Sequence, residues 1–234
     1  MKNNEDIQSI QKDVDDRISK YYGKKVSELK ERLGIKIDNK ASFVQLSKKM
    51  LKIPSNQFEL CDGRVNAVLK TVRLTGTNTP AESMSFMNID FKEWVDSPDW
   101  HASSLYRYFH DKVLVFFIFQ QYPSGKRVAD DEMTFLKAKA WKMPDYDLEH
   151  GLKEVWDEVR DLLKNNRLEI KAVTQKNGRQ VNKNNLPSMN FNELGHLRPG
   201  AKNGEDKVTL PDGQRIVRQR FWFNSSYVKE ILGI

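Results

Sequence analysis

The spacing of apolar residues predicts three helices at the start of the chain. In the first segment apolar residues recur three or four positions apart, at Ile7, Ile10, Val14 and Ile18. This period predicts an amphipathic helix over about residues 5–21, which Gly23 ends. A second short helix is expected from Ser27 to the stop signal at Gly34, and a third over residues 41–51 before Pro54. Residues 1–56 are therefore expected to form a helical arm.

Dense runs of branched and aromatic residues predict the strands that follow. Residues 65–74 form such a run, with Gly63 before them and a turn-forming stretch over residues 75–80 after them. Residues 83–89 are expected to be the return strand, with Met84 and Phe86 facing inward. Residues 113–119, VLVFFIF, give the strongest strand, and residues 133–141 are expected to pair antiparallel with it after a turn at residues 122–125.

The second half of the chain alternates helical and extended patterns. Residues 91–97 suit a helical turn with Trp94 packed, and a longer helix is expected from Asp145 or Asp147 to about Asn165. Its inward stripe comprises Leu148, Leu152, Val155, Val159 and Leu162. A basic hairpin or loop is expected over residues 171–185. The chain then predicts a strand holding three arginines and a last helix that Asn224 caps.

These elements predict an α/β protein with a mixed sheet flanked by helices. No internal repeat and no low-complexity linker interrupts the chain, so one domain over residues 1–234 is expected, with the sheet core and a C-terminal loop in residues 57–234. The 234 residues are enough to bury a core. The hydrophobic content of 38% with 30% charged residues is ordinary for a soluble globular protein.

Charge and cysteine content narrow the functional classes. The net charge of +7 and the isoelectric point near 9.3 favour acidic partners, with nucleic acid first, although a merely basic soluble protein is the alternative. The single Cys61 excludes an internal disulfide and suits the reducing cytoplasm. One cysteine and four histidines make a structural zinc site unexpected. No signal peptide and no apolar run of membrane-spanning length are visible, so no membrane partner is expected.

Several segments in a fixed order resemble one known family. These are VLKTV, AESMSF, WDEV with DLL, HLRPGAKN and FWFNSSYVKEIL, spread over residues 21–232. Together they resemble the MutH group, which holds mismatch-repair nickases and the type II restriction endonucleases that cut at GATC. The likeness is greatest to the C-terminal half of the two-domain GATC enzymes, which serves DNA binding and allosteric control. The resemblance implies a restriction-endonuclease-like sheet, an N-terminal helical subdomain and double-stranded DNA as partner.

The catalytic pattern of this family is incomplete in the chain. The family carries an Asp followed by Glu-x-Lys, of which Lys70 matches the lysine, while Val68 stands at the glutamate. The aspartate falls at Cys61, with Asp62 one residue off, and a further glutamate falls at Lys48. A phosphodiesterase of this kind needs carboxylates to hold Mg²⁺ and orient water. The sequence therefore predicts a degenerate nuclease site without a metal cofactor, in which Lys70 contacts phosphate or is structural.

The recognition motif is better kept. The Arg-Pro pair that the resemblance links to GATC recognition falls at Arg198 and Pro199, and arginine suits bidentate contacts to guanine. Gly200 replaces a lysine of the MutH nickases, which puts sensing of adenine methylation in doubt. Arg218 and Arg220 are expected on one face of a strand, as a phosphate-binding row. The residues expected to contact DNA are Lys70, Arg73, Arg198, Pro199, Lys202, Asn203, Arg215, Arg218 and Arg220.

Two other functions stay open at this point. One is an active magnesium-dependent GATC endonuclease with acids drawn from Asp62, Glu59 or Glu82. The other is a protein-interaction module, such as a phage-type inhibitor that uses its basic surface. If the protein is instead a DNA-binding effector, its expected protein partner is a catalytic nuclease domain or subunit. The remaining candidate groups are interpreted as ordinary structure: a solvated helix face at Glu28 and Lys30, a solvated turn at residues 130–132, surface or core histidines at His101 and His110, and core tryptophans at Trp141, Trp156 and Trp222.

Overall fold

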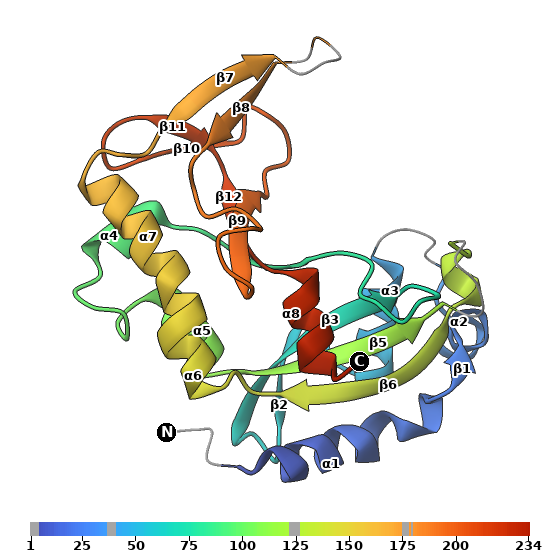
Figure 1. Ribbon diagram of the computed structural model, residues 1–234. Helices are drawn as coiled ribbons and strands as arrows, with labels where there is room; N and C mark the ends of the chain where they lie inside the picture. Colours follow the sequence, from blue (N-terminus) through green and yellow to red (C-terminus); the bar gives the residue numbers. More distant parts are fainter. Residues whose placement is uncertain (1–4, 37–40, 122–126, 175–177, 179) are drawn as a thin grey trace. The chain divides into compact units, whose positions relative to one another are not determined.

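The computed structural model describes residues 5–36, 41–121, 127–174, 178 and 180–234 (Figure 1). The protein is a mixed α/β structure with a curled mixed sheet flanked by helices. It forms two compact units. The first comprises residues 1–82, 108–143 and 228–234, and the second comprises residues 83–107 and 144–227. No helix within the described ranges is long and apolar enough to cross a membrane.

A five-stranded sheet forms the centre of the first unit. Its strands are β1 (Lys24–Lys25), β2 (Gln57–Leu60), β3 (Val65–Leu74), β5 (Val113–Gln120) and β6 (Thr134–Trp141). They lie in the order β1-β6-β5-β3-β2; β3 and β5 are parallel, and the other neighbours are antiparallel. Every residue of β5 is buried, as its unbroken apolar sequence requires. The expected strands over residues 65–74 and 113–119 are confirmed, as is the antiparallel partner over residues 133–141.

The helical arm packs on this sheet as the apolar spacing predicted. Its helices are α1 (Ile7–Ile18), α2 (Val26–Leu33) and α3 (Ser42–Leu51), and a 3-10 turn, η1 (Ser19–Tyr21), follows α1. Ile10, Val14 and Ile18 are buried, while Ile7 is 40% exposed. Helix α2 begins one residue before Ser27 and ends, as expected, at Gly34, whose positive φ of 65° suits glycine. The turn expected at residues 122–125 lies outside the described residues.

Helix α1 also closes an open edge of the sheet. The Gln11 side chain behaves like the peptide group of a neighbouring strand: its Oε1 accepts a hydrogen bond from the Ala140 N–H at 2.7 Å, and its Nε2 donates to the Ala138 carbonyl at 3.1 Å. Unpaired strand edges promote association with other chains. The side-chain amide of Gln11 therefore supplies hydrogen-bond partners to backbone groups of β6 that lie beyond the end of the short strand β1.

The charged face of α2 differs from expectation. Lys30 is 7% exposed, and its Nζ lies 2.5 Å from Asp131 Oδ1 in the 3-10 turn η2 (Asp130–Glu132). Glu28, in contrast, is exposed and pairs with Lys24 at 2.7 Å. The predicted solvated face is therefore wrong for Lys30, because the acidic turn supplies a carboxylate that compensates burial of its ammonium group.

The second unit contains a three-stranded antiparallel sheet. Its strands are β4 (Met84–Asn88), β9 (Gly195–Pro199) and β12 (Gln219–Phe223), with β12 in the middle. The expectation that residues 83–89 return along β3 is wrong, since β3 already pairs with β2 and β5. Instead Met84 and Phe86 are buried in the second unit, where the Phe86 ring centre lies 4.5 Å from that of Phe223.

The remaining elements of the second unit are helices and two short ribbons. Helix α4 (Phe91–Asp96) buries Trp94, and α6 (Asp145–Asp147), the π-helical turn η3 (Leu148–Leu152) and α7 (Lys153–Lys164) form the long helix with the expected buried stripe. The ribbons are β7 (Ile170–Thr174) with β8 (Gln180–Asn184) and β10 (Lys207–Thr209) with β11 (Arg215–Val217). Helices α5 (Ser104–His110) and α8 (Ser225–Leu232) each contain residues of both units.

Candidate nucleic-acid interface

The sheet of the second unit has a polar outer face. The strand register pairs Arg198 of β9 with Arg220 of β12, and His196 with Trp222. Residues paired across an antiparallel ladder point to the same face. The opposite face is apolar and buried, and it comprises Leu197, Phe221 and Phe223. Alternation along β12 thus separates a core face from a face that carries two arginines and a tryptophan.

Arg198 lies on an aromatic surface. Its guanidinium carbon is 4.6 Å from the centre of the Trp222 ring, and its side chain is exposed while Trp222 is half-buried. A guanidinium over an indole is held by its attraction to the π electrons of the ring. Trp222, expected only as a core residue, therefore also orients Arg198.

Gly200 makes room for Arg220. A Cβ at position 200 would lie 2.7 Å from the Arg220 Cβ and 3.0 Å from its Nε, and the Gly200 N–H bonds to the Arg218 carbonyl. A side chain there would displace Arg220, whose Nε donates to Asn88 Oδ1 at 3.1 Å. The glycine that departs from the resembling family is therefore tied to the position of this arginine.

The loop after Arg198 is held by Asp206. Its carboxylate accepts hydrogen bonds from the Lys202 N–H at 3.3 Å and from Arg218 Nε at 3.0 Å. The Lys202 bond and then the Arg218 bond lower the pKa of Asp206. Asn203 Oδ1 accepts hydrogen bonds from the N–H groups of Glu205 and Asp206, so the turn occupies the oxygen of this side-chain amide. Lys202 itself is exposed.

The predicted continuous arginine strand is two strands. Arg215 lies on β11, paired with Thr209, whereas Arg220 lies on β12 in the three-stranded sheet. Arg218 sits at the break between them, where its N–H donates to the Asp206 carbonyl at 2.9 Å. Arg218 and Arg220 each have a polar partner and are half-buried, and Arg215 is exposed. The alternation of buried residues shifts by one position across this break, since Ile216 is buried in β11 whereas Gln219, Phe221 and Phe223 are buried in β12.

A buried histidine, His196, lies on the same face of β9 as Arg198, two residues earlier in the strand. His196 is 2% exposed, with its Nδ1 2.6 Å from Asn224 Oδ1. The Asn224 Nδ2 donates to the carbonyls of Met189 and Asn192, which fixes the amide so that Nδ1 of the imidazole is the donor. Burial lowers the pKa of His196, and the charge of Arg198 acts in the same direction. The imidazole is therefore a neutral support for this face.

The strand that carries Lys70 belongs to the first unit. Lys70 is half-buried on β3, and Val68 is 5% exposed, on a strand inside the sheet. Asp62 precedes β3, and the five residue steps from Val65 to Lys70 span about 16 Å at the rise of a strand. At its other end Arg73 pairs with Glu82 at 3.2 Å. Within the described ranges no group of three or more His, Cys, Asp or Glu side chains is placed to hold a metal ion.

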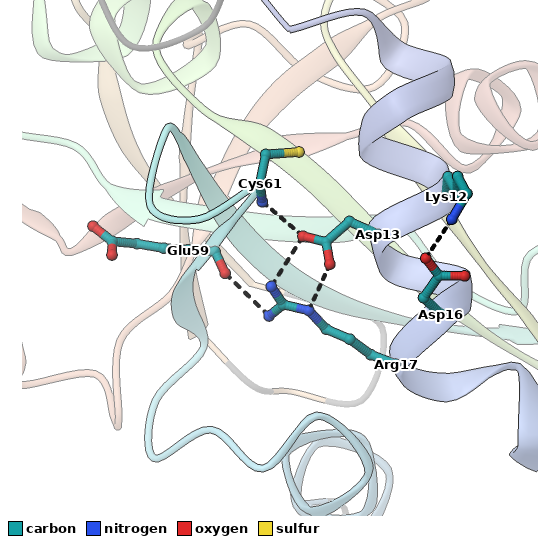
Figure 2. Close-up of polar contacts among 6 residues, drawn as sticks. All are labelled: Lys12, Asp13, Asp16, Arg17, Glu59 and Cys61. Atoms are coloured by element: carbon teal, nitrogen blue, oxygen red, sulfur yellow. Dashed lines mark hydrogen bonds and ion pairs between the residues drawn. The ribbon is translucent and has the colours of Figure 1, made fainter.

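The turn before β3 is anchored to helix α1. The Cys61 N–H donates to Asp13 Oδ2 at 2.6 Å, and Asp13 also receives two hydrogen bonds from Arg17, both of 2.9 Å (Figure 2). Arg17 donates in addition to the Glu59 carbonyl at 3.2 Å. Cys61 and Asp62 both adopt left-handed backbone angles, with φ of 51° and 56°. The position where the family places its aspartate is thus part of a tight, bonded turn.

The thiol in this turn is a poor metal ligand. Burial raises the pKa of Cys61, and the negative charges of Asp13 and Glu5 raise it further. A protonated thiol binds metal weakly because the thiolate is the ligand. Lys48, which falls at the family's helical glutamate, donates to the Pro54 carbonyl at 3.2 Å. The described residues of the first unit therefore position an ammonium group, a thiol and a valine where the family has carboxylates.

The other candidate residues have structural contacts. His101 lies 2.9 Å from Glu149, and His110 lies 2.8 Å from Asp111. Trp156 is buried, as expected for a core tryptophan, and Arg160 lies over its ring at 4.1 Å.

No protein-family model matches the sequence, and no curated protein matches it. The resemblance to the MutH group therefore stays a prediction that depends on the motifs alone.

Proposed function

We propose that the protein binds double-stranded DNA and recognises GATC-like sites, as a MutH-like member of the type II restriction endonuclease family. The observation that carries this proposal is the position of exposed Arg198 over the ring of Trp222, beside Arg220 on the same sheet face. An exposed arginine held over an aromatic ring is suited to the paired acceptors of guanine in the major groove. Lys202 and Arg215, both exposed, are suited to backbone phosphates.

The proposal includes a degenerate nuclease site. Its support is the chemistry around β3: a buried Val68 at the position of the family's glutamate, a protonated Cys61 in a bonded turn, and Glu82 engaged by Arg73. Hydrolysis by this family's route depends on carboxylates that hold a divalent ion. The chain would then act as an effector domain or accessory subunit beside a catalytic nuclease domain or subunit.

The finer fold assignment belongs to the same proposal. We propose that the five-stranded sheet is the restriction-endonuclease-like core, with α1, α2 and α3 as the helical subdomain. The parallel pair of β3 and β5 within an otherwise antiparallel sheet supports this assignment. Lys70 and Arg73, both half-buried on β3, would be phosphate-contacting or structural residues in that core.

A binding experiment tests the proposal. Fluorescence anisotropy would compare a labelled duplex containing one GATC with a duplex of the same composition in which those four bases are permuted, at physiological salt. Tighter binding to the GATC duplex is expected, because each mismatched base pair costs about 1–3 kcal/mol. Equal affinity for the two duplexes would defeat the claim of specificity, and no binding to either would defeat the proposal.

A further inference from the structure

The paired strands β7 and β8 form a ribbon outside the main sheets. The β7–β8 ribbon comprises Ile170–Thr174 and Gln180–Asn184, and both of its strands are edges (Figure 1). No side chain described in the ribbon is buried. An isolated two-stranded ribbon is marginally stable in water, since it buries little apolar surface. The ribbon therefore adds little to the core of its unit and presents its surface to solvent.

The base of the ribbon is nevertheless firmly held. Asn185 bridges the two strand ends: its Oδ1 accepts from the Glu169 N–H at 2.9 Å, and its Nδ2 donates to the Arg167 carbonyl at 3.0 Å. Leu168 and Leu186, which flank the ribbon, are each 5% exposed. The ribbon thus starts from a packed and hydrogen-bonded foot, which limits the conformational entropy it loses when something binds.

Two lysines face each other across the ribbon. The register pairs Lys171 directly with Lys183, and both are exposed. Like charges in opposite positions of an antiparallel pair destabilise it. Lys171 lies 2.5 Å from Glu169, but with 70% and 58% of these side chains exposed such an ion pair stabilises little. Residues 171–185 contain no acidic residue, so the repulsion is not balanced within the ribbon.

We infer that the β7–β8 ribbon is a second DNA contact, in which Lys171 and Lys183 bind backbone phosphates of the duplex. This inference rests on the proposed function. A two-stranded ribbon fits within the major groove, and two lysines on neighbouring strands can reach phosphates along its wall. A polyanion also removes the repulsion between the two ammonium groups. Because the lysines contact phosphates, the ribbon adds affinity without sequence preference.

The test is the salt dependence of binding by a double variant, Lys171→Gln with Lys183→Gln, in the full chain. The control, Lys12→Gln with Lys92→Gln, removes the same charge from two exposed lysines that pair with Asp16 and Asp96. Loss of two phosphate contacts should make the plot of the logarithm of the association constant against the logarithm of the salt concentration less steep. The slope should become less negative by about 1.8, which corresponds to a roughly 30-fold lower affinity at 0.15 M salt. GATC and permuted duplexes should be affected alike. The control should keep the slope, and the Lys171→Arg with Lys183→Arg variant should restore it.

The outcomes separate the ribbon from the proposed function. If the wild-type chain binds duplex DNA and the ribbon variant keeps its slope, the inference about the ribbon fails and the proposed function stands. If the ribbon variant and the control lose affinity equally, the effect is one of net charge and the inference fails. If the wild-type chain binds no duplex, both fail. A thermal unfolding midpoint equal to that of wild type shows that a lost slope does not reflect unfolding.

Discussion

The guanidinium of Arg198 lies over the ring of Trp222, 4.6 Å from its centre, and the two residues come from neighbouring strands of one sheet. This contact orients an exposed cation without neutralising its charge. The sheet supplies the rigidity, because the other face of β12 is packed with Phe221 and Phe223. A recognition arginine held against a ring loses less conformational entropy on binding than one on a free side chain.

Replacing the aromatic platform should therefore weaken recognition. We expect Trp222→Leu to reduce affinity for the GATC duplex by about 0.5–1 kcal/mol, the usual contribution of an exposed cation–π contact. Trp222→Phe should have a smaller effect because a weaker π surface remains. Anisotropy titrations measure both variants. If Trp222→Leu bound as tightly as wild type while Arg198→Gln did not, Arg198 would act without this platform.

The anchored turn before β3 makes a stability prediction. Asp13→Ala should remove the bonds to Arg17 and to the Cys61 N–H together and lower the free energy of unfolding by about 1–3 kcal/mol. Asp16→Ala, on the same helix, removes only the exposed ion pair with Lys12 and should change it by less than about 0.5 kcal/mol. Figure 2 shows both pairs. Chemical denaturation measures the difference, and equal losses in the two variants would contradict the role given to Asp13.

The buried imidazole predicts a dependence of stability on pH. The pKa of His196 in the folded chain lies below 6.5, so at pH values under 6.5 the unfolded chain binds this proton more readily. The free energy of unfolding should thus fall as pH decreases from about 6.5 towards the lowered pKa. His196→Gln should reduce this dependence. Chemical denaturation of wild type and His196→Gln at pH 7.5 and 5.5 tests this prediction. An identical loss of unfolding free energy in the variant would show that a group other than His196 causes the pH dependence.

The altered nuclease pattern predicts that the chain does not cleave DNA. Supercoiled plasmid with GATC sites, incubated with Mg²⁺ or Mn²⁺, should stay supercoiled, because the residues at the family's acid positions are Cys61, Val68 and Lys48. A parallel incubation of Lys70→Ala identifies contaminating nucleases. Nicking by the wild-type chain that disappears in Lys70→Ala would support the active endonuclease instead.

Much of the fold could be predicted from local patterns. The strand at residues 65–74 and the all-apolar strand at residues 113–119 were found because dense branched and aromatic residues suit buried strands. The strand that pairs with residues 83–89 could not be predicted, since alternation shows which face of a strand is buried but not which strand lies alongside it. Burial of Lys30 was also missed, because its carboxylate, on Asp131, is 101 residues away in the chain.

The candidate site was predicted in part. The motif around Arg198 pointed to an exposed arginine, which the structure describes, whereas Trp222 was expected only in the core. A signal for its second role was present: Trp222 shares the parity of Arg220 along the strand, so both point away from Phe221. The hydrogen bonds that hold Arg218 in the loop depend on Asp206, whose contribution no spacing rule shows.

The most direct test of the account is a binding titration of wild type and Arg198→Gln against the GATC and permuted duplexes. The account predicts that wild type prefers the GATC duplex and that Arg198→Gln loses about 1–3 kcal/mol of this preference while it keeps most of its affinity for the permuted duplex. Arg198→Lys, which keeps the charge, should lose the preference as well because lysine lacks the planar pair of donors. A preference for GATC that survives in Arg198→Gln, or a wild type that binds both duplexes equally, would contradict it.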